Sequence, residues 1–94
     1  MTALYRVPFV RFVKKQTRAF QLAIEDEVLT IMGAPEKGEA KKGDLSGFRV
    51  HKFKNHGQQY LIAYSMRDDN LIFFMIDRHE NFYNALKRHV KESQ

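Results

Sequence analysis

Hydrophobic and polar residues alternate with different periods along the chain of 94 residues, and each period predicts an element. Residues 3–7 have the character of a short strand. Pro8 then suits the first turn of a helix, where its missing N–H is not needed. Gly33 and Pro35 predict the end of a second, longer helix, since proline cannot continue it. The face of this helix consists of apolar residues at intervals of four and three, namely Phe20, Ile24, Val28 and Ile31.

Strand-like sequence fills the middle of the chain. In the first run, Phe48 and Val50 fall on one face of the strand. Arg49 and His51 fall on the other face. The second and third runs are apolar on both faces, which is typical of central strands, and short turn sequences separate the three runs. The runs are residues 47–54, 58–66 and 70–76.

The last predicted element is a helix that follows residues 77–80. Its inner face consists of residues at positions 0, 3, 4, 7 and 8, namely Phe82, Ala85, Leu86, His89 and Val90. The order β-α-α-β-β-β-α predicts an α+β fold with a small antiparallel sheet, built as one domain of residues 1–94. We expect the helices to cover one face of the sheet, with Arg49 and His51 on the other, partly open face.

The four ionisable residues that join the last strand to the last helix allow two interpretations. Asp77 and Glu80 have the spacing of a capping box, which is a purely structural role. Arg78, His79 and Tyr83 are not needed for that role. They lie in the first turn and a half of the helix, where backbone N–H groups favour an anion. Histidine exchanges protons near neutral pH, so this joint is also a candidate catalytic site.

The charge balance favours a polyanionic partner. The net charge is +5 and the isoelectric point is about 9.6, values expected of a small domain that binds nucleic acid or an acidic protein. Residues 33–47 form a long connection rich in glycine and lysine, which is either a mobile loop or a basic binding loop. No apolar run is long enough for a membrane span, and the N-terminus does not have the pattern of a signal peptide. With no cysteine in the chain, we expect a cytoplasmic protein.

Other classes of site find little support. The four histidines lack the spacing of a zinc site, and no phosphate-binding glycine motif is present, so we expect neither metal nor cofactor. Tyr60 and Tyr64 share one face of the second strand-like run. For them, packing in the core with a hydroxyl at the edge is favoured over stacking on bases.

The whole pattern resembles the RelE/ParE superfamily of toxins from bacterial type II toxin–antitoxin systems. The resemblance rests on the stretches FVRFVKK, GDLSGFRVHKF, YLIAYSMRDDNLIFFMI and HENFYNALKR, in that order. The last one resembles a subgroup in which the strand runs into His-Glu-Asn-Phe-Tyr. The resemblance implies a RelE-like fold with two N-terminal helices and one C-terminal helix.

The resemblance also implies a function. Many members are metal-independent endoribonucleases that cut mRNA on the ribosome and inhibit translation, and a cognate antitoxin holds them inactive. The implied partners are therefore the antitoxin, the ribosome and mRNA, with operator DNA bound only by the toxin–antitoxin complex. No membrane partner is expected.

The site residues implied by the resemblance form two groups. The catalytic group consists of His79, Tyr83, Arg49 and His51. Lys52 and Lys54 share the role of Arg49 and His51 if the strand register shifts by one residue. The cations expected to hold RNA are Lys41, Lys42, Lys52, Lys54, Arg78, Lys87 and Lys91. This interpretation requires Arg49, His51 and His79 to surround one hollow.

One position departs from the pattern of RNA-cutting members. They carry an arginine in the second strand-like run, where this chain has Leu61. An absent guanidinium removes charge stabilisation from the transition state. A toxin of the ParE type, which inhibits DNA gyrase without cutting RNA, therefore stays an alternative. A third is a regulatory member that mainly binds antitoxin and operator DNA.

Overall fold

The structure is a computed structural model that describes residues 1–92. Five strands form one sheet in the order β1-β5-β4-β3-β2. Neighbouring strands are antiparallel except β1 and β5, which are parallel, so the sheet is mixed and not purely antiparallel. The strands are β1 (Thr2–Tyr5), β2 (Glu39–Ala40), β3 (Arg49–Asn55), β4 (Gln58–Arg67) and β5 (Asn70–Arg78).

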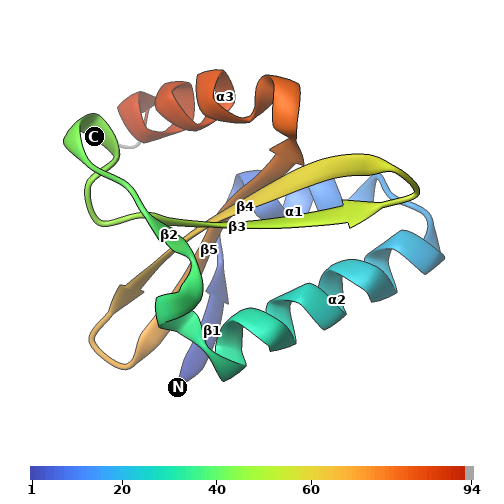
Figure 1. Ribbon diagram of the computed structural model, residues 1–94, viewed down its shortest axis with the longest axis horizontal. Helices are drawn as coiled ribbons and strands as arrows, with labels where there is room; N and C mark the ends of the chain where they lie inside the picture. The colour runs from blue at the N-terminus through green and yellow to red at the C-terminus, as the bar shows by residue number, and fades with distance from the viewer. Residues whose placement is uncertain (93–94) are drawn as a thin grey trace.

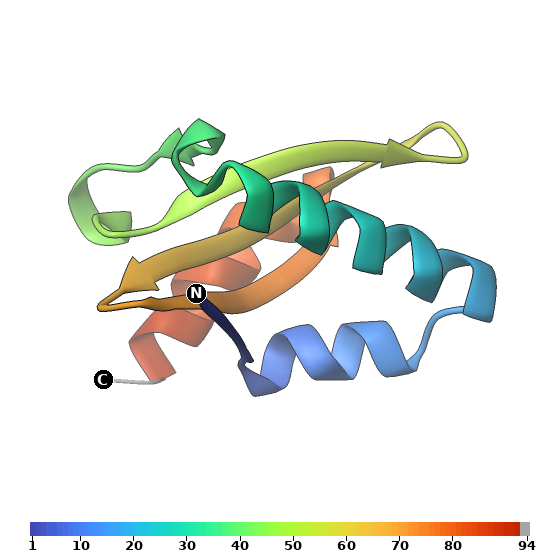
Figure 2. The ribbon, with the colours of Figure 1, turned by 90° about the horizontal axis from the view of Figure 1, so that it is seen from below.

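Helices lie on both faces of this sheet. Figures 1 and 2 show α1 (Val7–Lys14) and α2 (Arg18–Gly33) on one side and α3 (His79–Glu92) on the other. The expectation of one open face is therefore wrong. The central strands β4 and β5 are apolar on both faces, and each face needs a helical cover. None of the helices within residues 1–92 has the length and apolar character needed to cross a membrane.

The predicted apolar face of α2 packs against the sheet. Phe20, Ile24, Val28 and Ile31 are all buried, as the spacing predicted. The helix begins where the Thr17 side chain accepts a hydrogen bond from the Phe20 N–H at 3.2 Å. It ends at Gly33, and Pro35 opens the short 3-10 helix η1 (Pro35–Lys37). This turn starts the connection to β3, which also contains β2 and a second short helix, η2 (Gly43–Leu45).

The opposite face of the sheet carries a separate core beneath α3. Leu61 of β4 and Phe82 and Leu86 of α3 are fully buried there. Burying a side chain of this size contributes about 1.5–3 kcal/mol. We call this side of the sheet the α3 face and the opposite side the α2 face.

A β-bulge in β5 determines which side chains reach each face. Ala63 pairs with Met75 and Tyr64 pairs with Phe73, so Phe74 is an extra residue in β5. Phe74 and Met75 consequently both pack in the core under α3. Beyond the bulge the alternation is inverted relative to the start of the strand.

The hairpin between β3 and β4 fixes the register at the other end of the sheet. His56 and Gly57 both have positive φ, 50° and 79°, as a two-residue type I′ turn requires. Asn55 then pairs with Gln58, and this register places Lys52 opposite Leu61.

Candidate functional site

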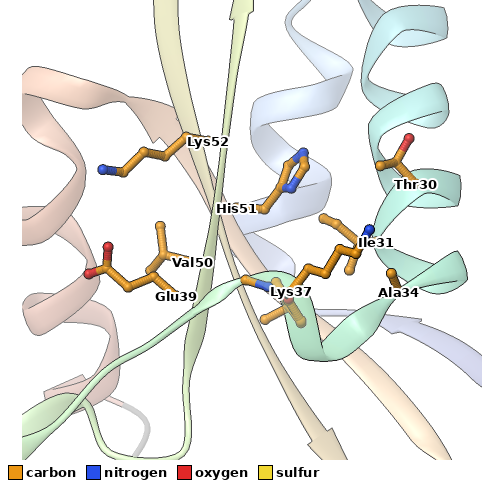
Figure 3. A pocket seen from close by; sticks show the side chains of 10 residues that line it. Thr30, Ile31, Ala34, Lys37, Glu39, Val50, His51 and Lys52 are labelled. Carbon is orange, nitrogen blue, oxygen red and sulfur yellow. Dashed lines mark hydrogen bonds between the residues drawn. The ribbon is translucent and has the colours of Figure 1, made fainter.

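Basic side chains of strand β3 point to both faces of the sheet. Arg49 and His51 do share a face, as predicted, but that face is covered by α2. Lys52 and Lys54 alternate with them and point to the α3 face. Figure 3 shows His51 directed toward α2, with Lys52 on the other side of the strand.

The side chains of Arg49 and His51 are engaged with other parts of the chain. His51 Nε2 lies 2.7 Å from Glu27 Oε1 on α2, and both side chains are partly buried. Arg49 Nη1 donates to the carbonyl oxygens of Glu36, at 2.9 Å, and Gly38, at 2.8 Å. A hollow of about 490 Å³ does lie beside His51, between α2 and β3, with Lys37 at its margin (Figure 3).

The predicted convergence of Arg49, His51 and His79 is wrong. Arg49 is level with Tyr64 in the sheet, whereas the strand that leads into His79 ends level with Tyr60. Four strand positions separate these levels, which is roughly 13 Å, and two strand spacings add about 10 Å across the sheet. The three side chains do not surround one hollow.

The joint at residues 77–80 is also built differently from the predicted capping box. Asp77 is still in β5, where it pairs with Leu61 and its Oδ1 accepts from the Arg78 N–H at 2.8 Å. Glu80 accepts from Gln58 Nε2 at 3.1–3.2 Å and does not reach back to Asp77. The box fails because the strand continues through Arg78, so the helix starts only at His79.

Arg78 does not stand in for the absent arginine. It pairs with Tyr60, whose ring packs in the core under α1 and α2, so Arg78 is directed to the α2 face. It is exposed there, on the opposite side of the sheet from Lys52 and Lys54. This direction follows from the bulge at Phe74.

A lysine and a tyrosine meet on the α3 face. Lys41 Nζ lies over the Tyr83 ring, 4.8 Å from its centroid. Lys41 also forms an ion pair with Glu39, two residues earlier on the same side of β2. The Glu39 carboxylate and, after it, the Tyr83 hydroxyl raise the pKa of Lys41 above its ordinary value.

Further cations extend this surface in two directions. Lys52 and Lys54 lie on β3, both exposed. Lys87 and Lys91 line a hollow of about 410 Å³ between α3 and the η2 turn. We define the lysine–tyrosine face as Tyr83 with Lys41, Lys52, Lys54, Lys87 and Lys91. Lys42 is exposed beside Lys41 in the chain.

The lysine–tyrosine face has the groups that phosphodiester chemistry requires. Several ammonium groups on this side of the sheet offer positive charge to a phosphate, and one of them, that of Lys41, lies over the Tyr83 ring. His79 lies one helical turn before Tyr83, so both are on the same side of α3. Six of the eleven predicted site residues belong to this face, and His79 lies at its end. Arg49, His51 and Arg78 point to the other side of the sheet.

Sequence reasoning missed two features of this region. It gave Lys41 a general RNA-binding role but did not predict its contact with Tyr83, because residues 33–47 were expected to form an irregular loop. It also gave no role to the Tyr64 hydroxyl, which donates to the Pro35 carbonyl at 2.6 Å and accepts from the Gly38 N–H at 3.0 Å. The prediction that Tyr64 packs in the core is confirmed.

Comparisons with known proteins address the family. A family model described as the ParE-like toxin of type II bacterial toxin–antitoxin systems matches residues 4–87. No curated protein matches the chain. The chain is similar to the solution structure of the conserved hypothetical protein HP0894 from Helicobacter pylori, with a TM-score of 0.52 and 19% identity, over 85% of this chain and 96% of that chain.

At this identity the likeness to HP0894 is one of fold. Together with three helices around a five-stranded sheet, it confirms the predicted α+β class of the RelE-like type. The family match extends from the second half of β1 into α3 and therefore includes β2 to β5 and Tyr83. The chain belongs to the ParE-like toxin family of type II bacterial toxin–antitoxin systems.

Proposed function

We propose that this toxin inhibits translation by cleaving mRNA on the ribosome, and that the lysine–tyrosine face holds the scissile phosphate. Family membership implies a cognate antitoxin as partner. The observation that carries the proposal is the contact of Lys41 with Tyr83 on the same face as Lys52 and Lys54. A surface of this charge attracts the RNA backbone, with an affinity that falls steeply as salt rises.

The reaction we assign is attack of a ribose 2′-OH on the adjacent phosphorus, with loss of the 5′-oxygen as an alcohol. It requires a base for the 2′-OH proton, an acid for the leaving oxygen, and positive charge near the phosphorane oxygens. Tyr83 and His79 are the groups proposed to exchange protons. Lys52 and Lys54 are proposed to stabilise the phosphorane charge, in the place first given to Arg49 and His51.

Inhibition of DNA gyrase without RNA cleavage is the second candidate, and Leu61 favours it. Leu61 is fully buried beneath α3, so the position of the family arginine is closed to substrate. Arg78 is directed to the opposite face and does not replace it. A toxin that only binds its target does not need this guanidinium.

The test is to map transcript ends by primer extension in cells that express the wild type or one of three variants. Tyr83→Phe removes the hydroxyl, and Lys52→Ala with Lys54→Ala removes two ammonium groups. The control pair is Lys14→Ala with Lys15→Ala, because these exposed lysines lie at the end of α1, on the opposite side of the sheet.

We expect new transcript ends with the wild type and the control pair. The Tyr83→Phe and Lys52→Ala/Lys54→Ala proteins should cleave at least tenfold less, since single groups of this kind contribute about 10²–10³ in rate. Intact transcripts together with DNA damage in cells that express the wild-type toxin would refute RNA cleavage and favour inhibition of DNA gyrase. Full cleavage by both site variants would remove the lysine–tyrosine face from the mechanism.

A further inference from the structure

We propose that Arg49 and Tyr64 are positioning residues that hold Lys41 over Tyr83 from the opposite side of the sheet. Both side chains bind the backbone of residues 35–38, and we call this set of contacts the clasp. The inference depends on the proposed function only for its effect on activity. Its structural part concerns the Lys41–Tyr83 contact alone.

The clasp joins two neighbouring strands to one short turn. Arg49 Nη1 donates to the carbonyl oxygens of Glu36 and Gly38, at 2.9 and 2.8 Å. The Tyr64 hydroxyl donates to the carbonyl oxygen of Pro35 at 2.6 Å and accepts from the N–H of Gly38 at 3.0 Å. Arg49 and Tyr64 are themselves paired across β3 and β4. Four backbone groups within four residues are thus bound by two side chains from a rigid sheet.

Gly38 allows the turn to approach the sheet this closely. A Cβ atom at this position would lie 2.1 Å from the Tyr64 hydroxyl oxygen and 2.8 Å from Cζ of the ring. Any larger residue must push the turn away from β4. The close approach also desolvates the Tyr64 hydroxyl, and this burial raises the pKa of Tyr64, so the proton it donates to Pro35 is retained.

The turn determines where β2 begins and so where Lys41 lies. Gly38 directly precedes β2, which has only two residues. Beyond it, the Lys41 N–H donates to the Phe48 carbonyl at 2.9 Å. So short a strand is weakly held by its own pairing. The clasp fixes its first end, three residues before the ammonium group that contacts Tyr83.

A simpler role for Tyr64 is to fill the core with its ring, which is 1% exposed. Phenylalanine would fill the same space, so Tyr64→Phe separates the two roles. Tyr60→Phe is a matched control. Tyr60 lies on the same face of β4 and is buried, but none of the hydrogen bonds found among residues 1–92 involves its hydroxyl.

The experiment compares wild type, Tyr64→Phe, Tyr60→Phe and Arg49→Lys by NMR. The Tyr83 ring shifts the Lys41 side-chain proton signals, and nuclear Overhauser contacts report the same proximity. In Tyr64→Phe and Arg49→Lys we expect at least half of the Lys41 ring shift to be lost and the pKa of Lys41 to fall by the part that the Tyr83 hydroxyl contributes, while the part due to Glu39 remains. In Tyr60→Phe both values should match the wild type.

Activity supplies the second readout. If the clasp acts through Lys41, Tyr64→Phe should lower the cleavage rate about tenfold, in line with the effect of small misplacements. It should lower the rate no further in a Lys41→Ala background. An additive effect there would overturn the positioning role.

Different results would refute the positioning role of the clasp and the proposed function. Lys41 signals that are unchanged in Tyr64→Phe, or equally changed in Tyr60→Phe, would overturn the positioning role whatever the activity. A wild-type protein that cuts no RNA would instead refute the proposed function. In that case the Lys41 signals would still decide whether the clasp places the lysine.

Discussion

Replacing Leu61 with arginine tests whether the α3 face is closed at the position where RNA-cutting relatives carry a guanidinium. Leu61 is fully buried, between Lys52 and Asp77 in the sheet and beneath Phe82 and Leu86. The variant introduces the residue that RNA-cutting members carry, so a comparison of sequences alone predicts higher cleavage activity. The structure predicts a loss of stability.

The expected loss is about 3–5 kcal/mol. Removing the leucine forfeits roughly 1.5–3 kcal/mol of apolar burial. A guanidinium in its place is desolvated among apolar side chains, which costs several kcal/mol more. Asp77 lies directly opposite and offsets part of that cost, whereas Lys52 on the other side adds repulsion. A domain of this size has about 5–15 kcal/mol of total stability, so the variant folds with little margin.

Urea unfolding followed by circular dichroism measures this loss, with Met66→Arg as the control. Met66 lies on the same strand but is 43% exposed, so its substitution should change the free energy of unfolding by no more than about 0.5 kcal/mol. A Leu61→Arg protein within about 1 kcal/mol of wild type would refute the reasoning. It would mean that the guanidinium reaches solvent and that position 61 is accessible to a phosphate.

Three further predictions concern stability. His51→Gln should lower the free energy of unfolding by at most about 1 kcal/mol in urea and leave growth arrest intact, because His51 contacts Glu27 and not the lysine–tyrosine face. Leu86→Ala should cost about 2–5 kcal/mol in the same assay, since Leu86 is fully buried under α3. Folding raises the pKa of Tyr64 above 10.0. The protonated Tyr64 hydroxyl therefore contributes fully to the free energy of unfolding below pH 10, and this contribution is lost as pH rises through the folded-state pKa. Between pH 8 and 12 the thermal unfolding temperature should therefore fall less steeply with pH in Tyr64→Phe than in the wild type. Equal slopes of unfolding temperature against pH in the two proteins would contradict this.

Much of the fold could be predicted from local patterns. The spacing of Phe20, Ile24, Val28 and Ile31 identified the buried face of α2, and the alternation in β3 correctly separated Phe48 and Val50 from Arg49 and His51. These predictions succeeded because burial of one face imposes its own period on the sequence.

The site was harder to predict because it depends on contacts between distant segments. Alternation showed that Arg49 and His51 share a face but not which helix covers it. In the structure, His51 contacts Glu27 on α2, and Arg49 donates to the carbonyl oxygens of Glu36 and Gly38 after α2, so the face is the one that α2 covers. The alternation in β3 is the predicted one, without a shift of register, and it places Lys52 and Lys54 on the side of Tyr83.

The extra residue at Phe74 bears on how roles are transferred between relatives. Sequence comparison assumes that aligned positions occupy equivalent places, yet the extra residue exchanges the two faces for the residues that follow it in β5, up to Arg78. When a relative without the extra residue is aligned without a gap, the counterpart of Arg78 lies on the α3 face, where this chain has Asp77. Functional correspondence between position 75 and the end of β5 therefore has to be established from backbone superposition, because an alignment that omits the gap reverses the conclusion.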